Sequence, residues 1–135
     1  IKSMALSQCY GIEAGRELRW EVARNHGAGV VRKLLPLDLG PGVLLNINFP
    51  DCEPDQVAGA AVTRQGKRDQ NMLIVDERVD ARGRDYYWLG FRREMSNPAD
   101  GTDLKAVYSR QISVTPLHMN LTQLEAMEPL RAVLE

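Results

Sequence analysis

The sequence lacks any long hydrophobic run, since no stretch approaches the ~18 apolar residues that a membrane-spanning helix needs. Its opening residues, IKSMALSQCYG, also lack the charged start, apolar stretch and cleavage pattern of a secretory signal. It has no excess of either charge, with 17 Lys and Arg against 18 Asp and Glu. This balance argues against a protein that binds nucleic acid or an anionic membrane by bulk charge. We therefore expect a cytoplasmic protein with no membrane partner.

Cysteine is scarce as well: Cys9 and Cys52 are the only two, which is too few for a disulfide framework. We expect reduced thiols. The 135 residues, 44% hydrophobic and 26% charged, are ordinary for a single globular domain or part of one. The chain has no initiator methionine and opens directly in an apolar, strand-like run. We therefore expect it to be a piece of a longer protein.

The apolar pattern predicts an α/β fold. Residues 1–7 read as a buried strand, residues 16–35 as an amphipathic helix ended by Pro36, and residues 43–49 and 57–64 as strands. Along the helix, residues at i+4 steps form a stripe suited to packing on a sheet: Leu18, Val22, His26, Val30 and Leu34.

The stretch from residue 43 to residue 49 changes from an apolar run to an alternation. In a strand, Asn46 and Asn48 then point to one face, and Ile47 and Phe49 point to the other. The pattern therefore predicts one apolar and one polar face for this strand.

Residues 72–79 and 85–91 predict a long hairpin, because Gly83 lies in the charged segment that joins them. Its apolar and aromatic side chains lie on both faces and include Leu73, Val75, Tyr86, Tyr87 and Trp88. An isolated hairpin cannot bury both of its faces. We expect these five residues to contact the rest of the domain or a partner chain.

The C-terminal part predicts a short helix capped by Thr102 or Asp103, then a last strand that Pro116 ends. Thr122 and Glu125 have capping-box spacing, so Thr122 is expected to cap a terminal helix. Pro129 predicts a kink there, or two short helices. The chain then divides into three parts: residues 1–64 as the end of an α/β core, 65–100 as a hairpin arm, and 101–135 as the last strand and terminal helix.

Two thiols and two imidazoles have the chemistry of a zinc site: Cys9, His26, Cys52 and His118. Structural zinc sites usually take ligands in pairs a few residues apart, and no two of these four are close in sequence. The alternative is that the cysteines are small apolar fillers and that His26 lies in or beside the core stripe of its helix.

Nucleophilic catalysis would need Ser113 or Thr115 as nucleophile, His118 as base and Asp103 to orient the base. Ser113 and Thr115 share one face of an extended strand, so both could point at a cleft. The alternative is a strand end whose hydroxyls satisfy backbone groups.

Motifs for phosphates and metals are absent. Gly66 and Lys67 resemble part of a P-loop, but Arg68 stands where Ser or Thr is needed and Ala61 where the first glycine is needed. There is no Asp-Asp or Asp-x-Asp pair to hold a catalytic Mg²⁺ or Mn²⁺. Asp51 and Asp55 are the nearest approach.

A patch for single-stranded nucleic acid would combine the three arm aromatics with the basic residues Arg64, Lys67, Arg68, Arg92 and Arg93. Acidic residues are interleaved with these, as at Asp69, Asp76, Glu77, Asp80, Asp85 and Glu94. That mixture favours a solvated surface over a nucleic-acid site. From the residues alone, the chain has a fold but no convincing catalytic centre.

Five segments, taken in order, resemble the C-terminal half of the SurE survival-protein family: LLNINFPD, VAGAAVTRQGKRD, DARGRDYYWLG, PADGTDLKAV and ISVTPLHMNLT. SMALSQ is similar to the strand that follows the catalytic region of that family. The resemblance covers essentially the whole chain. It implies the C-terminal half of a Rossmann-like α/β sandwich with a projecting β-hairpin arm and a C-terminal helix.

The resemblance also implies an activity: metal-dependent 5′- and 3′-nucleotidases that act on nucleoside monophosphates, some of them also on polyphosphate. In such proteins the arm and terminal helix are exchanged between subunits of dimers and tetramers. The family's metal ligands, an adjacent Asp pair, a Ser and an Asn, lie in the N-terminal half. None has a counterpart here, so no catalytic or metal residue is carried over. The Mg²⁺ or Mn²⁺ is expected in the full-length parent, and this piece alone is expected to be inactive.

Overall fold

The computed structural model describes residues 1–10, 18–67, 73–91 and 97–134. In chain order its elements are β1 (Ser3–Gln8), α1 (Glu21–Leu34), β2 (Val43–Phe49), the 3₁₀ turn η1 (Pro54–Gln56), β3 (Ala60–Val62), β4 (Leu73–Val79), β5 (Asp85–Phe91), α2 (Asp103–Tyr108), β6 (Ile112–His118), the 3₁₀ turn η3 (Leu124–Ala126) and α3 (Met127–Leu134). No helix among the described residues is long and apolar enough to cross a membrane.

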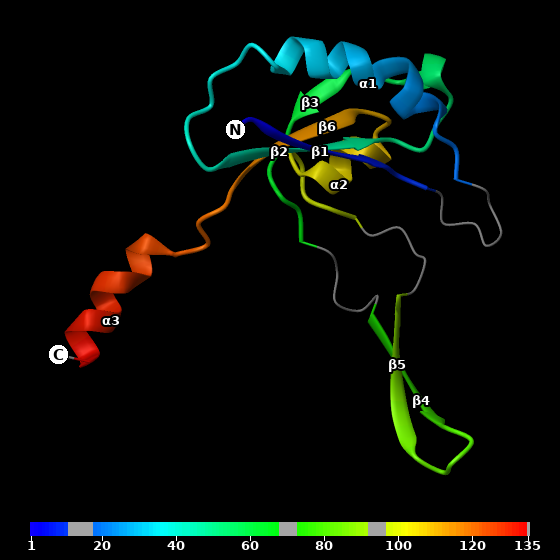
Figure 1. Cartoon of the computed structure of the whole chain (residues 1–135), viewed down its shortest axis with the longest axis vertical. Helices are drawn as coiled ribbons and strands as arrows, with labels where there is room; N and C mark the ends of the chain where they lie inside the picture. The colour runs from blue at the N-terminus through cyan, green and yellow to red at the C-terminus, as the bar shows by residue number, and fades with distance from the viewer. Residues whose placement is uncertain (11–17, 68–72, 92–96, 135) are drawn as a thin grey trace.

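Four strands form a mixed sheet in the order β1-β2-β6-β3. β1 runs parallel to β2, β2 antiparallel to β6, and β3 parallel to β6. α1 lies on one face of this sheet and α2 on the other (Figure 1). The predicted α/β fold, with its hairpin and C-terminal helix, is confirmed.

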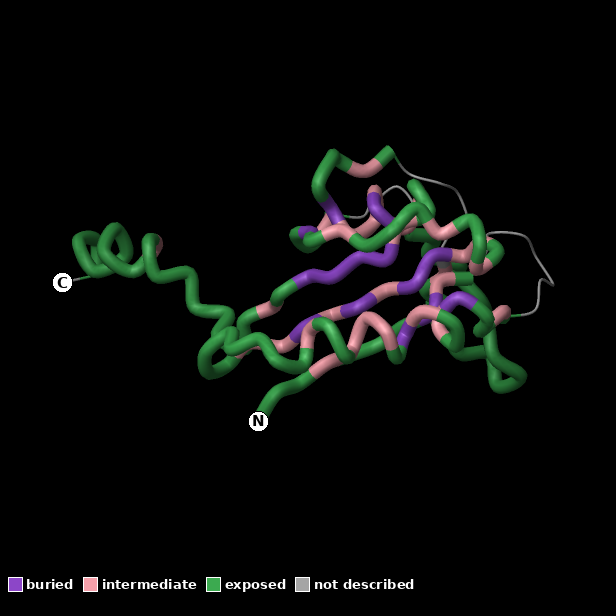
Figure 2. Tube along the Cα trace, turned by 90° about the horizontal axis from the view of Figure 1, so that it is seen from above, coloured by how far each residue is buried: buried purple, intermediate pink, exposed green. Residues whose placement is uncertain are grey.

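The core lies between α1 and the sheet. The predicted alternation in β2 is confirmed, because Ile47 and Phe49 are fully buried on the α1 face while Asn46 and Asn48 are half-buried on the other. The remaining buried residues of this cluster are Val22, Leu45, Ile112 and Val114. Buried positions accordingly concentrate in the middle of the sheet (Figure 2). Each large apolar side chain removed from water in this way contributes about 1.5–3 kcal/mol.

α1 is shorter than predicted. It begins at Glu21 rather than near residue 16, and Leu18, placed in the apolar stripe, is 40% exposed before the helix. Trp20 is its N-cap and makes no side-chain capping hydrogen bond, so nothing at residues 18–20 extends the helix. The helix ends at Leu34, two residues before Pro36, as a proline stop requires.

α2 begins as predicted, with Thr102 as its N-cap. The Thr102 hydroxyl accepts a hydrogen bond from the Lys105 backbone N–H at 3.3 Å and donates one to the Ala99 carbonyl at 2.7 Å. The helix packs on the sheet through the buried Ala106. It covers part of the polar face of β2 and β6.

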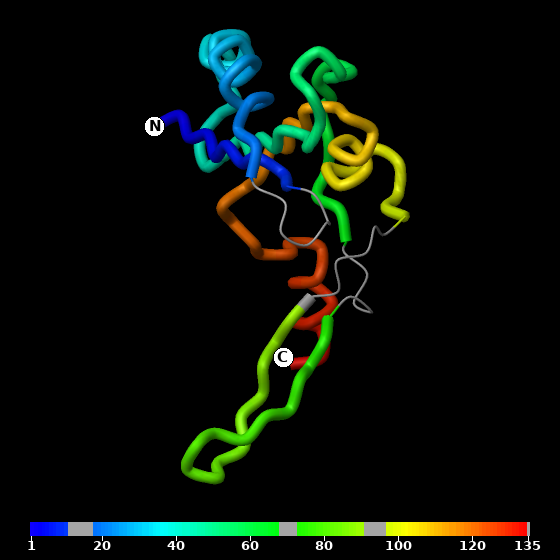
Figure 3. Tube along the Cα trace, turned by 90° about the vertical axis from the view of Figure 1, so that its right-hand side faces the viewer, coloured from blue at the N-terminus to red at the C-terminus, as the bar shows by residue number. Residues whose placement is uncertain are grey.

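β4 and β5 form the predicted antiparallel hairpin, here called the arm, with Leu73 opposite Phe91 and Val79 opposite Asp85. At its tip Gly83 has φ +74°, and the Asp80 carboxylate accepts hydrogen bonds from the backbone N–H groups of Arg82 and Arg84. The arm extends away from the sheet, and α3 lies apart from the sheet as well (Figures 1 and 3).

The predicted end of the last strand at Pro116 is wrong. β6 continues to His118, with Pro116 opposite Leu45. On this strand the backbone groups of Ile112 and Val114 bond toward β3, and β3 ends at Val62, so the Pro116 nitrogen points to a side with no further strand. A proline costs the ladder nothing where no N–H is needed.

The predicted cap at Thr122 is also wrong. The Thr122 N–H donates to the Asn120 side chain, and η3 has Gln123 as its N-cap. α3 begins at Met127, so Pro129 lies in its first turn, where a backbone N–H would have no helical partner. The result is a 3₁₀ turn followed by one helix, close to the predicted pair of short helices.

Candidate functional site

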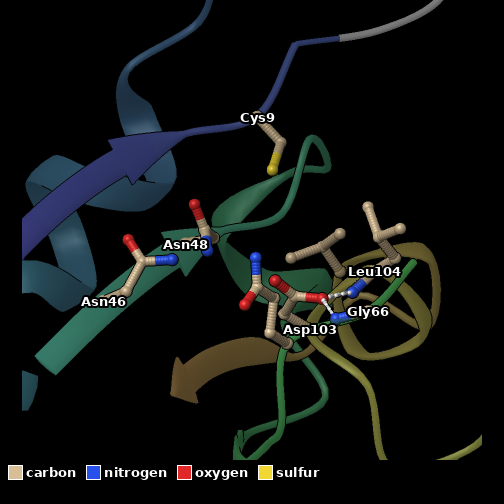
Figure 4. A pocket seen from close by; sticks show the side chains of 8 residues that line it. Cys9, Asn46, Asn48, Gly66, Asp103 and Leu104 are labelled. Carbon is tan, nitrogen blue, oxygen red and sulfur yellow. Dashed lines mark hydrogen bonds between the residues drawn. The ribbon is translucent and has the colours of Figure 1, made fainter. Parts of the chain in front are cut away.

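A cavity of about 340 Å³ lies on the face of the sheet opposite α1 (Figure 4). Its lining comes from β2, from the residue after β1, from the loop after β3 and from α2, and consists of Cys9, Asn46, Asn48, Gln65, Gly66, Asp103, Leu104 and Val107. Segments far apart in the sequence therefore meet at one site, which is the usual way in which a fold builds a binding site.

The strand register places polar side chains along the floor of this cavity. Asn46 lies opposite Thr115, and Asn48 lies opposite Ser113. The Asn48 amide is 3.5 Å from the Ser113 hydroxyl, at the limit of a hydrogen bond. Thr115 is hydrogen-bonded at 2.7 Å to Thr63, which follows β3. The floor is therefore held by contacts across three strands.

Asp103 holds the wall of the cavity. Its Oδ1 accepts hydrogen bonds from the backbone N–H groups of Gly66 and Leu104, both at 2.8 Å (Figure 4). A Cβ at Gly66 would lie 2.9 Å from that oxygen and 3.2 Å from the Cβ of Thr102, so a side chain at residue 66 would push the loop off α2. Glycine is required here because the backbone approaches so closely.

Next to the cavity, the chain segments that precede and follow the arm are hydrogen-bonded to each other. The Arg64 N–H donates to the Gly101 carbonyl, and the Asp103 N–H donates to the Arg64 carbonyl, both at 3.0 Å. The contacts of Asp103 thus connect the segment before the arm, the start of α2 and the cavity wall.

The structure does not assemble the proposed catalytic triad. Ser113 and Thr115 do share a face, as predicted, but both are fully buried and hydrogen-bonded to side chains rather than to the backbone. His118 is three residues beyond Thr115 on the same strand and so points to the opposite face, where its Nδ1 accepts the Asn120 N–H at 3.1 Å. Asp103 bonds to backbone groups and not to His118. The two hydroxyls therefore have side-chain partners instead of the backbone partners that the alternative expected, and the strand continues past them to His118.

The four candidate zinc ligands are not brought together either. Within the ranges that the structure covers, no group of three or more His, Cys, Asp or Glu side chains could hold a metal ion. The His26 Nε2 is 2.9 Å from the Pro54 carbonyl, Cys52 packs partly buried against the core, and Cys9 lines the cavity. Burial raises the pKa of the Cys52 thiol, an effect that Arg110 opposes and the nearby Asp51 and Glu53 reinforce.

The basic and aromatic patch is only partly visible, because Arg68, Arg92 and Arg93 lie outside the described residues. The guanidinium of Arg78 lies over the Trp88 ring at 5.9 Å from its centroid and also pairs with Asp76 at 2.9 Å. That carboxylate neutralises the cation beside the aromatic ring. Arg78 is not one of the five basic residues of the patch, so the mixed, solvated surface stays a prediction.

Sequence reasoning missed an ion-pair cluster in front of α1. Arg19 pairs with Glu53 and lies 3.5 Å from Asp51, across the loop that follows β2. Burial acts to lower the pKa of Arg19, but hydrogen bonds and charge attraction from the two carboxylates outweigh it and raise that pKa. These contacts join residues more than thirty positions apart, so no local pattern in the sequence predicts them.

The cavity was missed as well. The alternation that places Asn46 and Asn48 on the polar face of a strand is the available signal in the sequence. What the sequence did not show was that Gly66 and Asp103, 37 residues apart, close a wall over them.

Comparison with known proteins identifies the family. The family model described as Survival protein SurE matches residues 1–72. A protein of Methylobacterium radiotolerans named 5′-nucleotidase SurE is 52% identical over 122 residues, which are 90% of this chain and 48% of that protein. A protein of the same name from Parvibaculum lavamentivorans is 48% identical over 134 residues, covering 99% of this chain and 48% of its own length.

A solved structure agrees with these relatives. The crystal structure of the SurE protein from Aquifex aeolicus superposes with a TM-score of 0.79 at 31% identity, covering all of this chain and 52% of that one. The chain spans about half the length of the curated relatives that it matches. With matching sequence over nearly its full length and the same fold, this chain belongs to the SurE family.

Proposed function

We propose that the chain is the C-terminal half of a divalent-metal-dependent nucleotidase that hydrolyses nucleoside 5′- and 3′-monophosphates. The observation that carries this proposal is the identity of about half of all residues, over 90–99% of the chain, to proteins named 5′-nucleotidase SurE. The cavity supports it, because a polar site formed by several elements suits a small polar substrate.

The described residues do not fit the Mg²⁺ or Mn²⁺ that such a reaction needs. Those cations prefer several converging oxygen ligands, with carboxylates among them. Asp103 uses one oxygen for two backbone N–H groups, and Asp51 lies beside the Arg19 guanidinium. We therefore derive no catalytic step from these residues and propose that the metal ligands belong to the other half of a protein of the relatives' length.

For this half we propose a role in the fold and in assembly. Five arm residues carry it, all at least 40% exposed on the isolated chain: Leu73, Val75, Tyr86, Tyr87 and Trp88. Val75 and Tyr87 belong to one face of the arm, and Tyr86 and Trp88 belong to the other. Exposed apolar groups on both faces favour contact with a second copy in a homodimer or homotetramer.

A chimaera tests the proposed activity. The matching half of the Methylobacterium radiotolerans relative is replaced by this chain, and phosphate release from nucleoside 5′-monophosphates is measured with Mg²⁺ or Mn²⁺. We expect release by the chimaera, loss of release in EDTA, and none from the 135 residues alone.

Two outcomes would contradict the proposal. Phosphate release by the 135-residue chain above an enzyme-free blank would show that these residues contain the reaction centre. A chimaera that folds and assembles but releases no phosphate would favour the competing function, a non-catalytic oligomerisation module. The weaker alternative, a binder of single-stranded nucleic acid, requires an affinity that falls as salt is raised.

A further inference from the structure

We propose that the cavity binds the nucleoside end of the substrate, its sugar and base, and that Asn46 and Asn48 make the hydrogen bonds that hold it. This inference rests on the proposed function for the identity of the ligand. The location of the site, and which part of the ligand enters it, are inferred from the cavity itself.

The cavity has a suitable size. Its 340 Å³ lies at the lower end of the range of about 300–1,000 Å³ that small-molecule sites occupy. That volume is in the range expected for a small ligand such as a nucleoside.

The floor offers the hydrogen-bonding groups that a base recognises. Asn46 and Asn48 each carry an amide that both donates and accepts, as does Gln65 in the lining. Asn46 is half-buried, its side chain lies in the cavity lining, and no hydrogen bond to that side chain occurs among the residues that the structure describes (Figure 4). Such an amide needs a partner from water or from a ligand.

The wall supplies the apolar surface that a planar ring needs. Leu104 and Val107 line the cavity from α2, while Asn46 and Asn48 lie on β2. Sites for small molecules combine apolar side chains with a few well-placed polar groups in this way. The wall is preorganised, because Asp103 fixes the Gly66 loop to the first turn of α2.

Charge decides which end of the nucleotide enters. Among the described residues that line the cavity, Asp103 is the only one with a charged side chain, and it is acidic. A carboxylate repels a phosphate but accepts hydrogen bonds from sugar hydroxyls. Because none of the described lining residues is a cation that would offset this carboxylate, the cavity favours the neutral nucleoside and leaves the phosphate outside.

The test is a binding titration without metal or turnover. The ¹⁵N-labelled 135-residue chain is titrated with adenosine, with cytidine and with inorganic phosphate, and amide shifts are followed by NMR. We expect one or both nucleosides to shift the signals of Asn46, Asn48, Gly66 and Leu104, and phosphate to leave them in place.

Variants make the test specific. Asn46→Ala should weaken nucleoside binding about three- to tenfold, as the loss of one hydrogen bond predicts. Asn25→Ala is the matched control, since Asn25 is exposed on α1, across the sheet from the cavity. It should bind as the original chain does. Asn46→Asp, close to isosteric, is the second variant in case the alanine variant does not fold.

The inference is overturned if the folded chain shows no shift with either nucleoside at millimolar concentration. It is equally overturned if phosphate shifts the same signals, or if both Asn46 variants bind like the control. An active chimaera whose chain binds no nucleoside would overturn this inference alone. Nucleoside binding by a chain whose chimaera is inactive would overturn the proposed activity alone.

Discussion

Thr63 and Thr115 form a hydroxyl pair that joins β6 to the residue after β3. Both side chains are buried, with 7% and 1% of their surfaces exposed, and their oxygens lie 2.7 Å apart. Thr115→Val keeps the shape and suits a strand but leaves the Thr63 hydroxyl without this partner. We expect the free energy of unfolding, measured by urea denaturation, to fall by about 1–3 kcal/mol.

The double variant separates the hydrogen bond from other effects. Thr63→Val together with Thr115→Val removes both polar groups, so it should cost less than the sum of the single changes. Thr122→Val, at an exposed threonine, is the control and should change stability little. Strictly additive single changes would show that the two hydroxyls do not stabilise each other.

At the scale of residues, the sequence predicted what depends on near neighbours. The cap at Thr102 and the alternation of Asn46 with Ile47 follow from spacing alone, and both are confirmed. The role of Asp103 was not predictable, because its partner Gly66 is 37 positions away. An aspartate at the start of a helix has the same local pattern whether it orients a catalytic base or holds a distant loop.

At the scale of elements, α1 contains two glycines that weaken it. A Cβ at Gly29 would meet no atom within 4 Å, whereas one at Gly27 would lie 3.6 Å from the Phe49 ring, which is ordinary contact. Gly29→Ala removes backbone entropy from the unfolded chain at no steric cost. We expect it to raise the free energy of unfolding by about 0.5–1 kcal/mol, measured by urea or thermal denaturation.

Gly83→Ala is the control for this prediction. Gly83 has φ +74°, which disfavours a side chain although nothing lies within 4 Å of its Cβ position. The same exchange should therefore destabilise the arm turn. If both alanines shift stability in the same direction, backbone conformation does not govern these two positions.

The elements themselves were largely predictable, and their ends were less so. The strand at residues 43–49 follows from the alternation of its apolar residues, and the arm follows from the turn-forming Gly83 between two strand-like segments. The prediction that the last strand ends at Pro116 was wrong for a different reason. The strand continues through Pro116 because β3 has already ended beside it, so no backbone N–H is needed at that position. Sheet order and strand length in the neighbour are properties of the fold, and the local sequence does not contain them.

At the scale of the whole molecule, the described chain leaves much apolar surface uncovered. α3 has no buried residue, and Leu130, Val133 and Leu134 on it are 59–84% exposed. The arm also exposes apolar and aromatic side chains, and it does so on both of its faces. Exposed apolar groups gathered on projecting elements are typical of an interaction surface. The family resemblance implied that the arm and terminal helix are exchanged between subunits, whereas composition alone did not predict this.

A charge placed on the arm tests assembly through it. Val75, 57% exposed, lies opposite Leu89, and Val75→Glu would bring a carboxylate into any contact that the arm makes with a second copy. We expect the original chain to associate at tens of micromolar in sedimentation velocity. The variant should associate at least tenfold more weakly, because an unpaired charge is costly to bury.

Leu37→Glu, at a leucine 47% exposed outside the arm, is the matched control and should associate like the original chain. A clean monomer of the original chain, or equal association of both variants, would exclude the arm as the contact. If both variants associate equally, the exposed apolar residues of α3 are the next surface to test.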